Sequence, residues 1–161
     1  MEAQLTIREA TPADRAAAER VLLDCERHYW GQRDGDEATT QETAAALLEG
    51  RSGCTLMLAF APEPVGFATW TLLHPAPTPA GTVFLKDLYV TAAARGTGTG
   101  EALLRAVAGI AAARGCARFD WTAEDDNPRA VAFYDRLGAE RVDEKLYFRL
   151  SGAAIARFAD G

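Results

Sequence analysis

The chain has 161 residues, of which 48% are hydrophobic, 25% charged and 9% aromatic, and its formal net charge is −6. This length is typical of one domain, and the composition is that of a globular protein rather than a disordered or fibrous one. The negative charge and the lack of any run of Lys and Arg argue against a nucleic-acid-binding protein, and a cationic substrate fits the charge better.

The cysteines give no sign of a structural cross-link. Cys25, Cys54 and Cys116 are odd in number, lie far apart and form no CxxC or His-rich pattern, so we expect neither a disulfide framework nor a metal site. The first ten residues lack the basic start and apolar run of a signal peptide. The longest apolar region is interrupted by APEP at residues 61–64, so we expect no membrane-spanning segment and a cytoplasmic protein.

The first third of the chain predicts one strand and two helices. LTIREA (residues 5–10) alternates as a strand does, and TPAD (residues 11–14) is typical of a helix start, with Pro in the first turn and Asp near the positive end. Residues 28–40 carry little apolar periodicity and predict a loop. A short second helix follows over residues 40–48.

The middle of the chain predicts a hairpin and a strand-turn-helix unit. TLMLAF (55–60) and VGFATWTLL (65–73) indicate two antiparallel strands, and a Pro-rich loop follows them. TVFLKDLYV (82–90) is the most strand-like run in the chain. RGTGTG (95–100) comes next and is followed by a regular apolar helix face that reaches to Gly115.

The last third predicts two more strands and two helices. A strand is expected over residues 118–124 and another over VDEKLYFRL (142–150). Between them a helix runs from Asn127, the N-cap, to Gly138, and a short helix closes the chain at residues 153–159. The order predicts an α/β (α+β) fold with a mixed, mostly antiparallel sheet of about six or seven strands flanked by helices. We expect one domain over residues 1–161, with residues 5–150 as its core and residues 151–161 as the short C-terminal helix.

The glycines of RGTGTG need a reason, because bare backbone costs order. A P-loop requires Lys and Ser or Thr after its last glycine, whereas Glu101 and Ala102 follow Gly100. A dinucleotide turn joins the strand directly, and although Asp120 lies at the acidic offset, the third glycine is one residue early and TAAAR intervenes. RGTGTG could also be a flexible turn that binds no ligand. The remaining interpretation is a pyrophosphate cradle, formed by N–H groups at a helix N-terminus and by Arg95.

Two motifs together resemble the GNAT superfamily of N-acetyltransferases. The run DLYVTAAARGTGTGEALL (87–104) is similar to its coenzyme A signature, in which Arg or Gln precedes Gly-x-Gly or Gly-x-Ala. EDDNPRAVAFYDRLGA (124–139) is similar to the second family motif, and the two occur in the family's order about thirty residues apart. The matching residues are Arg95, Gly96, Gly98 and Gly100 in the first motif, and Asn127, Phe133, Tyr134 and Gly138 in the second.

The resemblance implies the GNAT-like acyl-CoA N-acyltransferase fold, an acetyl-CoA co-substrate and no metal. It implies that the backbone amides of Leu88, Tyr89 and Val90 bind the pantetheine arm and the thioester carbonyl. Tyr134 would donate the proton to sulfur, although it could also be a packing aromatic beside Phe133. The residues expected to contact coenzyme A are Arg95, Gly96, Thr97, Gly98, Thr99, Gly100 and Asn127.

Acetyl transfer to an amine also needs help with a proton. An alkylammonium has a pKa near 10, so only about one molecule in a thousand is neutral at pH 7. Asp87 is one candidate base or amine-binding anion, and strand alternation puts it on the same face as Leu85 and Tyr89. Glu124, at the end of the next strand, is the other candidate, or else a solvated loop acid.

The acceptor is described less fully by the sequence. The ending FYDRLGAERVDEKLYFRLSGAAIARFA (133–159) resembles the diamine and polyamine acetyltransferases, and a homodimer is expected by the same resemblance. Those enzymes often carry two adjacent acids where this chain has Lys86 and Asp87. Alternation predicts that Lys86 faces away from Asp87. Tyr29 and Trp30, after the first helix, could form an acceptor wall that binds cations through ring faces, or could simply plug a loop.

Three hypotheses follow. The first is an acetyl-CoA-dependent N-acetyltransferase that acts on a primary amine of a small molecule by direct transfer. The second is a non-catalytic coenzyme A-binding sensor or regulatory module, and Lys86 is the residue that favours it. The third is a nicotinamide-binding oxidoreductase.

Overall fold

The computed structural model describes residues 4–33 and 36–160, and the chain comprises two compact units that join between Thr122 and Ala123. The first unit contains a sheet and three α-helices, and the second contains two further helices. The elements of the first unit are β1 (Thr6–Glu9), the 3-10 turn η1 (Pro12–Asp14), α1 (Arg15–Trp30), α2 (Asp36–Leu48), β2 (Thr55–Phe60), β3 (Pro64–Leu73), β4 (Thr82–Val90), the 3-10 turn η2 (Ala92–Ala94), α3 (Thr99–Arg114) and β5 (Phe119–Asp120).

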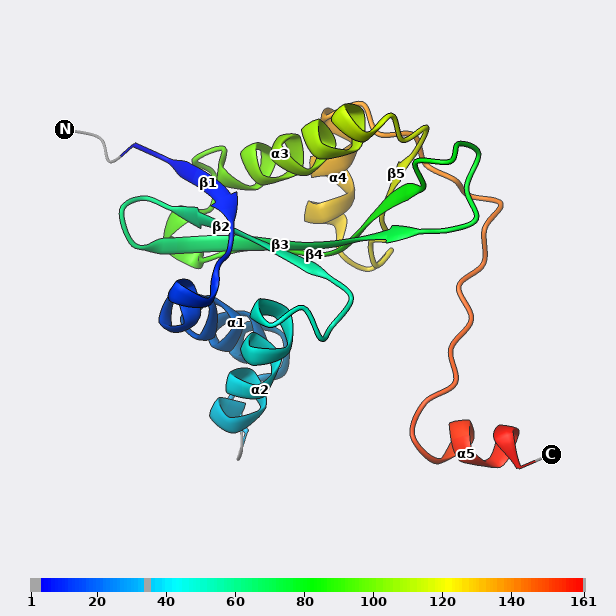
Figure 1. Cartoon of the computed structure of the whole chain (residues 1–161), viewed down its shortest axis with the longest axis horizontal. Coiled ribbons are helices and arrows are strands. Elements are labelled where there is room, and N and C mark those ends of the chain that lie inside the picture. The colour runs from blue at the N-terminus through cyan, green and yellow to red at the C-terminus, as the bar shows by residue number, and fades with distance from the viewer. Residues whose placement is uncertain (1–3, 34–35, 161) are drawn as a thin grey trace. The chain divides into compact units, whose positions relative to one another are not determined.

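The sheet of the first unit has the strand order β1-β2-β3-β4-β5 (Figure 1). The first four strands pair antiparallel, and β4 pairs with β5 in parallel. The mixed, mostly antiparallel α/β fold is therefore confirmed. The strand count is lower than predicted: the described residues form five strands, and the strand expected over residues 118–124 is reduced to Phe119–Asp120.

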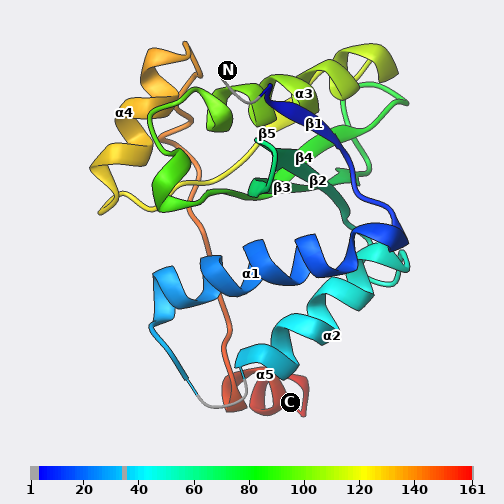
Figure 2. The same ribbon diagram turned by 90° about the vertical axis from the view of Figure 1, so that its left-hand side faces the viewer.

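Helices cover both faces of this sheet. Figures 1 and 2 show α1 and α2 on one face and α3 on the other. On the α1 and α2 side, one apolar cluster joins the helices to β2, β3 and β4. Its buried members are Ala18, Val21, Leu22, Ala44, Leu56, Leu58, Phe67 and Tyr89.

A β-bulge divides β4 into two halves. Asp87 pairs with Thr69 of β3, but the next β3 residue, Trp70, pairs with Leu85, so Lys86 is an extra residue without a partner. Because side chains alternate along a strand, one extra residue reverses the faces beyond it. Asp87 shares the α1 and α2 face with Tyr89 as predicted, but the prediction that it shares a face with Leu85 is wrong.

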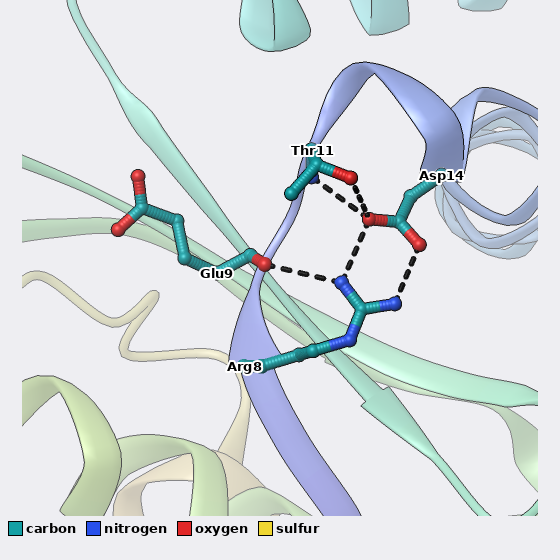
Figure 3. Close-up of polar contacts among 4 residues, drawn as sticks. All are labelled: Arg8, Glu9, Thr11 and Asp14. Atoms are coloured by element: carbon teal, nitrogen blue, oxygen red, sulfur yellow. Dashed lines mark hydrogen bonds and ion pairs between the residues drawn. The ribbon is translucent and has the colours of Figure 1, made fainter.

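The N-terminal end of α1 is tied to β1 by one polar cluster (Figure 3). The Arg8 guanidinium forms two parallel bonds to the Asp14 carboxylate, at 2.7 and 2.6 Å, and the Thr11 N–H donates to the same carboxylate at 2.8 Å. Arg8 holds the pKa of Asp14 well below its usual range. The helix start predicted from TPAD is thus confirmed and also fixed to the sheet.

The loop predicted over residues 28–40 is wrong at both ends. α1 continues through Trp30 and ends at Gly31, whose φ of 70° is left-handed, and α2 already begins at Asp36. Apolar periodicity could not show this extension, because the rings of His28 and Tyr29 pack on Tyr89, a residue distant in sequence. Residues 34 and 35 of the predicted loop lie outside the described residues.

The second unit contains α4 (Pro128–Arg136) and α5 (Ala153–Ala159). The predicted cap of α4 is confirmed, since the Asn127 side chain accepts from the Ala130 N–H at 3.1 Å. The strand predicted over residues 142–150 is not formed. Within the described residues no strand pairs with this segment, and alternation alone cannot make a strand without a hydrogen-bonding partner.

Candidate active site

The Gly-rich turn lies between the end of β4 and the start of α3. Gly96 and Gly98 have φ values of 81° and 86°, a left-handed backbone that favours glycine. A Cβ atom built on either glycine would meet no atom within 4 Å, so the backbone there is open. The first turn of α3 leaves its N–H groups without helical acceptors. These features suit a bound anion.

Thr97 and Thr99 hold the turn in shape. The Thr97 hydroxyl donates to the Ala94 carbonyl at 2.7 Å and lies 2.9 Å from the Thr99 hydroxyl. Thr99 is buried, whereas Gly96, Thr97 and Gly98 are exposed. The two hydroxyls therefore bond within the turn, while the backbone of residues 96–98 is exposed.

Arg95 is tethered to the end of β4. Its Nε–H donates to the Val90 carbonyl at 3.1 Å, and its guanidinium lies 5.7 Å from the centre of the Tyr89 ring. These contacts keep a positive charge beside the turn. The binding of an anion by this turn stays a prediction.

The C-terminal half of β4 has one unpaired edge. β4 pairs with β3 through Val90, whereas its pairing with β5 covers only Val83 and Phe84. Within the described sheet, the residues from Leu85 to Val90 therefore have no strand neighbour on the β5 side. Backbone groups alternate between the two edges of a strand, and the Thr91 N–H donates to the Val65 carbonyl of β3, so the groups of Leu88 and Val90 face the free edge whereas those of Tyr89 face β3. The predicted binding of a ligand by these three residues stays a prediction.

The buried side chain of Tyr89 links β4 to α1 through a hydrogen bond. Its hydroxyl donates to the Asp24 carboxylate at 2.7 Å. Burial, and then this hydrogen bond to an anion, raise the pKa of the Tyr89 phenol. Tyr89 therefore stays protonated and anchors α1 to β4, and nothing in the sequence marked Asp24 as its partner.

A cavity of about 310 Å³ opens on the α1 and α2 face beside Asp87. Its walls come from α1, α2, the segment before β2, and strands β3 and β4. Leu22, Ala46 and Leu47 form its apolar part, and Glu42 lies on its α2 wall. Glu42 is not among the residues predicted from the sequence, since an acid on a helix surface gives no signal by itself.

Asp87 is held by two neighbours in this cavity. The Thr69 hydroxyl donates to one carboxylate oxygen at 2.8 Å, and the Lys86 ammonium lies 3.1 Å from the other. Lys86 and Asp87 both line the cavity, so the prediction that they face apart is wrong. The bulge at Lys86 is the reason, because it interrupts the alternation.

The charge of Asp87 affects the pKa values of two nearby thiols, Cys25 and Cys54. Burial, followed by the charges of Asp87, Glu26 and Asp24, raises the pKa of Cys25 to about 12. Burial and the charge of Asp87 also raise the pKa of Cys54, which lines the cavity. Neither thiol is activated as a nucleophile, because the thiolate is disfavoured.

Tyr29 and Trp30 lie on the last turn of α1 rather than in a loop. The Tyr29 ring centre is 6.5 Å from that of Tyr89, and burial raises the pKa of the Tyr29 phenol. Trp30 is two-thirds exposed, with the Arg33 guanidinium 5.9 Å from its ring. The described residues that line the cavity include neither ring, so their role at an acceptor stays a prediction.

The remaining predicted residues lie in the second unit. Tyr134 lies on α4 with its ring centre 5.1 Å from that of Phe133, and it is half-buried. Asn127 caps the same helix, and Glu124, which is exposed, accepts from the Asn127 N–H through its backbone carbonyl at 3.1 Å. Their catalytic and coenzyme-binding roles stay predictions.

Neither a metal centre nor a membrane-crossing helix is seen in the described part of the chain. Residues 4–33 and 36–160 contain no group of three or more His, Cys, Asp or Glu side chains placed to hold a metal ion. None of the helices in these residues combines the length and apolarity needed to cross a bilayer. The three cysteines are free thiols.

The sequence of the chain matches a known family. Residues 16–139 fit the model of the acetyltransferase (GNAT) family. The chain belongs to this family. The match includes the Gly-rich turn, the residues of the cavity at Asp87 and α4, and it confirms the predicted resemblance to the GNAT superfamily.

Individual relatives agree with this assignment. An aminoglycoside N(6′)-acetyltransferase type 1 of Stenotrophomonas maltophilia is 31% identical over 150 residues, which cover 90% of this chain and 92% of that protein. A thialysine N-epsilon-acetyltransferase of Mus musculus is 34% identical over 96 residues, 58% of this chain, and the chain spans about half (52%) of that relative.

A solved structure extends the likeness to the whole fold. An integron cassette protein from the mobile metagenome of V. cholerae matches with a TM-score of 0.85 and 33% identity, covering 98% of both chains. The family model and the acetyltransferase relatives together support an enzyme that transfers an acetyl group to nitrogen.

Proposed function

We propose that the chain transfers an acetyl group from acetyl-CoA directly to a primary amine of a small molecule. The observation that carries this proposal is that a single strand, β4, contributes to both the cavity and the Gly-rich turn. The C-terminal half of β4 places Asp87 in a cavity on one side, and its free edge leads into the open Gly-rich turn. The two curated relatives are named for acetylation of thialysine and of aminoglycosides, which are both amines.

The donor side of the site suits a coenzyme A pyrophosphate. Gly96 and Gly98 leave the turn backbone open, the α3 N-terminus carries a partial positive charge, and Arg95 adds a full one. The free edge of β4 at Leu88 to Val90 can bind the amide groups of the pantetheine arm as another strand would. When bound, acetyl-CoA supplies the activated acetyl group and a thiol leaving group.

On the acceptor side, Asp87 binds the ammonium and removes its proton, directly or through water. The amine nitrogen then forms a bond to the acetyl carbon while the carbon–sulfur bond breaks. Backbone N–H groups of β4 stabilise the negative charge that develops on the acetyl oxygen. Tyr134 donates its phenolic proton to the departing sulfur, and the second proton that the acylated nitrogen must lose returns to the Tyr134 phenolate through water, which leaves a neutral amide, a free thiol and an unchanged Tyr134.

Glu124 is the second candidate for the base. Asp87 has stronger support, since its carboxylate lies in the cavity and is oriented by the Thr69 hydroxyl. The variants Asp87→Asn and Glu124→Gln separate the two. The variant that removes the base should flatten the rise of kcat/KM with pH, and if both variants keep the wild-type profile, neither carboxylate is the base.

A second candidate function is a coenzyme A-binding sensor without turnover. Its supporting observation is that Lys86 already neutralises the Asp87 carboxylate at 3.1 Å. Incubation of the protein with acetyl-CoA and a panel of diamines, amino acids, aminoglycosides and peptides, with detection of free thiol, distinguishes the two. Thiol release with any amine supports the enzyme, whereas tight acetyl-CoA binding without release from any acceptor supports the sensor.

The role of Tyr134 has its own test. Tyr134→Phe should lower kcat about a hundredfold while acetyl-CoA affinity barely changes, because only the proton donor is lost. Tyr147→Phe makes the same chemical change at a side chain that is 73% exposed, and it should leave kcat unchanged. Wild-type turnover in Tyr134→Phe would remove Tyr134 from the mechanism.

We further propose that both units belong to one N-acetyltransferase domain, as predicted for residues 1–161. The family model supports this, since its match at residues 16–139 extends across the junction of the units. We also propose a cytoplasmic location for the activity, as predicted from the sequence.

A homodimer formed through the C-terminal segment is part of the same proposal. Seven large apolar side chains in the described part of the second unit are exposed, and exposed apolar side chains in such number are typical of an interaction surface. They are Val142, Leu146, Tyr147, Phe148, Leu150, Ile155 and Phe158. Light scattering after size-exclusion chromatography should give twice the mass of 17.3 kDa, and Phe148→Asp should return the monomer. A monomeric wild-type protein at micromolar concentration would contradict the dimer.

A further inference from the structure

Each acidic side chain that lines the cavity beside Asp87 already has a cationic partner. The Asp87 carboxylate lies 3.1 Å from the Lys86 ammonium, and the Glu42 carboxylate lies 3.3 Å from the Arg51 guanidinium. Among the described residues, Asp87, Glu42 and Lys86 are the charged groups that line the cavity. With Arg51 at its edge, the acceptor site is close to neutral, although the whole chain has a net charge of −6.

The negative net charge of the chain would suit any cationic acceptor. The near-neutral charge of the cavity distinguishes a polyamine from an acceptor that carries both an amine and an anion. A polyamine that binds Asp87 must displace Lys86, and the freed ammonium then faces another positive charge. Like charges at such short range are unfavourable, above all where a cavity excludes part of the water. An acceptor that carries an anion as well as an amine exchanges partners instead: its ammonium takes Asp87 and its anion takes Lys86, and no charge is left unpaired.

The bulge makes this exchange possible. In a regular strand Lys86 would face away from Asp87, but as the unpaired residue it faces the same cavity. Its side chain is 63% exposed and long enough to move away from Asp87 while it stays at the cavity mouth. The apolar walls at Leu22, Ala46 and Leu47 suit a short aliphatic side chain, and about 310 Å³ is at the small end of ligand cavities.

We propose that the acceptor is an amino acid, with its amine at Asp87 and its carboxylate at Lys86. This inference rests on the proposed N-acetyltransferase function and names its substrate class. Lys86 is then the residue that determines specificity, because it distinguishes an amino acid from the amine that lacks the carboxylate. Lys86 offers one ammonium group and not a bidentate guanidinium, so the preference for the amino acid should correspond to a single charged hydrogen bond.

The test uses pairs of acceptors that differ only in the carboxylate. L-lysine is compared with 1,5-diaminopentane, and L-ornithine with 1,4-diaminobutane, by initial rates of thiol release. The wild-type protein should prefer the amino acid of each pair in kcat/KM by about tenfold or more, the range expected for one charged hydrogen bond. The methyl ester of L-lysine keeps the bulk of the carboxylate without its charge, and should react as the diamine does.

Variants of Lys86 assign the preference to this side chain. In Lys86→Gln the ratio of kcat/KM for the amino acid to kcat/KM for the diamine should fall to one or below. Asp87 then has no cationic partner and can bind a diamine without repulsion. Lys86→Arg should keep the preference. Arg15→Gln removes one positive charge from α1 outside the cavity and should also keep it. Thermal unfolding and acetyl-CoA affinity, measured on each variant, show whether the fold and the donor site are intact.

The possible failures are distinguishable. Equal or higher kcat/KM for the diamines in the wild-type protein would overturn the inference, as would an unchanged ratio in Lys86→Gln. Thiol release with aminoglycosides or peptides but with no amino acid would overturn the inference and leave the proposed function intact. A protein that releases no thiol with any amine would overturn the proposed function itself, and the inference with it.

Discussion

Gly66 of β3 lies directly against the end of β4, the strand whose opposite, free edge we assign to the donor. It pairs with Val90, and a Cβ atom at this position would lie 2.6 Å from the Tyr89 carbonyl oxygen and 3.3 Å from the Val90 Cα. Carbon and oxygen atoms approach to about 3.3 Å in ordinary close contacts, so Gly66→Ala requires the strands to separate by roughly 0.7 Å. The obstacle is backbone on both counts, so no side-chain rotation relieves it.

Gly66→Ala should therefore destabilise the protein by about 1–3 kcal/mol, as overpacking of an ordered interior does. For a chain of this size that corresponds to a melting temperature lower by about 3–10 °C. Gly109→Ala is the matched control: Gly109 lies in α3 with no atom within 4 Å of a new Cβ, and its replacement should stabilise by about 0.5–1 kcal/mol. Thermal and urea unfolding check both. An unchanged or raised melting temperature in Gly66→Ala would show that the strands are not held as closely as described.

Three further predictions concern the helix start, the half-buried thiol of Cys25 and the turn. Asp14→Asn should cost about 1 kcal/mol at pH 7, the usual value of such a cap, and since the folded pKa of Asp14 is lowered, the difference from wild type in urea unfolding should shrink as pH falls below about 4. A constant difference would contradict the ion pair with Arg8. Cys25, with a pKa of about 12, should react with iodoacetamide at pH 8 about a thousandfold more slowly than in the unfolded chain; peptide mapping by mass spectrometry checks this, and fast labelling would contradict its burial. Gly98→Ala places a side chain at a φ of 86° and should weaken acetyl-CoA binding in calorimetry while the unfolding free energy falls by about 1 kcal/mol; unchanged affinity would contradict the role of the turn.

Local signals in the sequence predicted most of the elements of the first unit. The hairpin of β2 and β3, the strand β4, the Gly-rich turn and the length of α3 were predicted, because apolar periodicity and glycine act within a few residues. The end of α1 was wrong, since His28 and Tyr29 are helical through packing on Tyr89, far away in sequence. The strand expected at residues 142–150 has the right alternation, but pairing is a property of two segments, and alternation in one of them cannot supply the other.

The candidate site was predicted in the same uneven way. Asp87 and the turn were identified from sequence, and the structure places them on one strand-turn-helix unit. Thr69 could have been noticed as one of two threonines in a largely apolar strand, whereas Glu42 and Asp24 carry no local signal. The relation of Lys86 to Asp87 was wrong because a bulge is a register effect between two strands, and strict alternation assumes that no such effect occurs.

The extra residue in β4 also has a consequence for how the protein can change over evolution. Leu85, before the bulge, is buried on the face of the sheet that it shares with Trp70, and Asp87, after the bulge, lines the cavity on the opposite face. A substitution at position 86 therefore alters the charge at this cavity, where we propose that the acceptor binds, without any change of volume on the Leu85 face. New acceptor preferences can arise in this segment one residue at a time, with little risk to the fold that supports them.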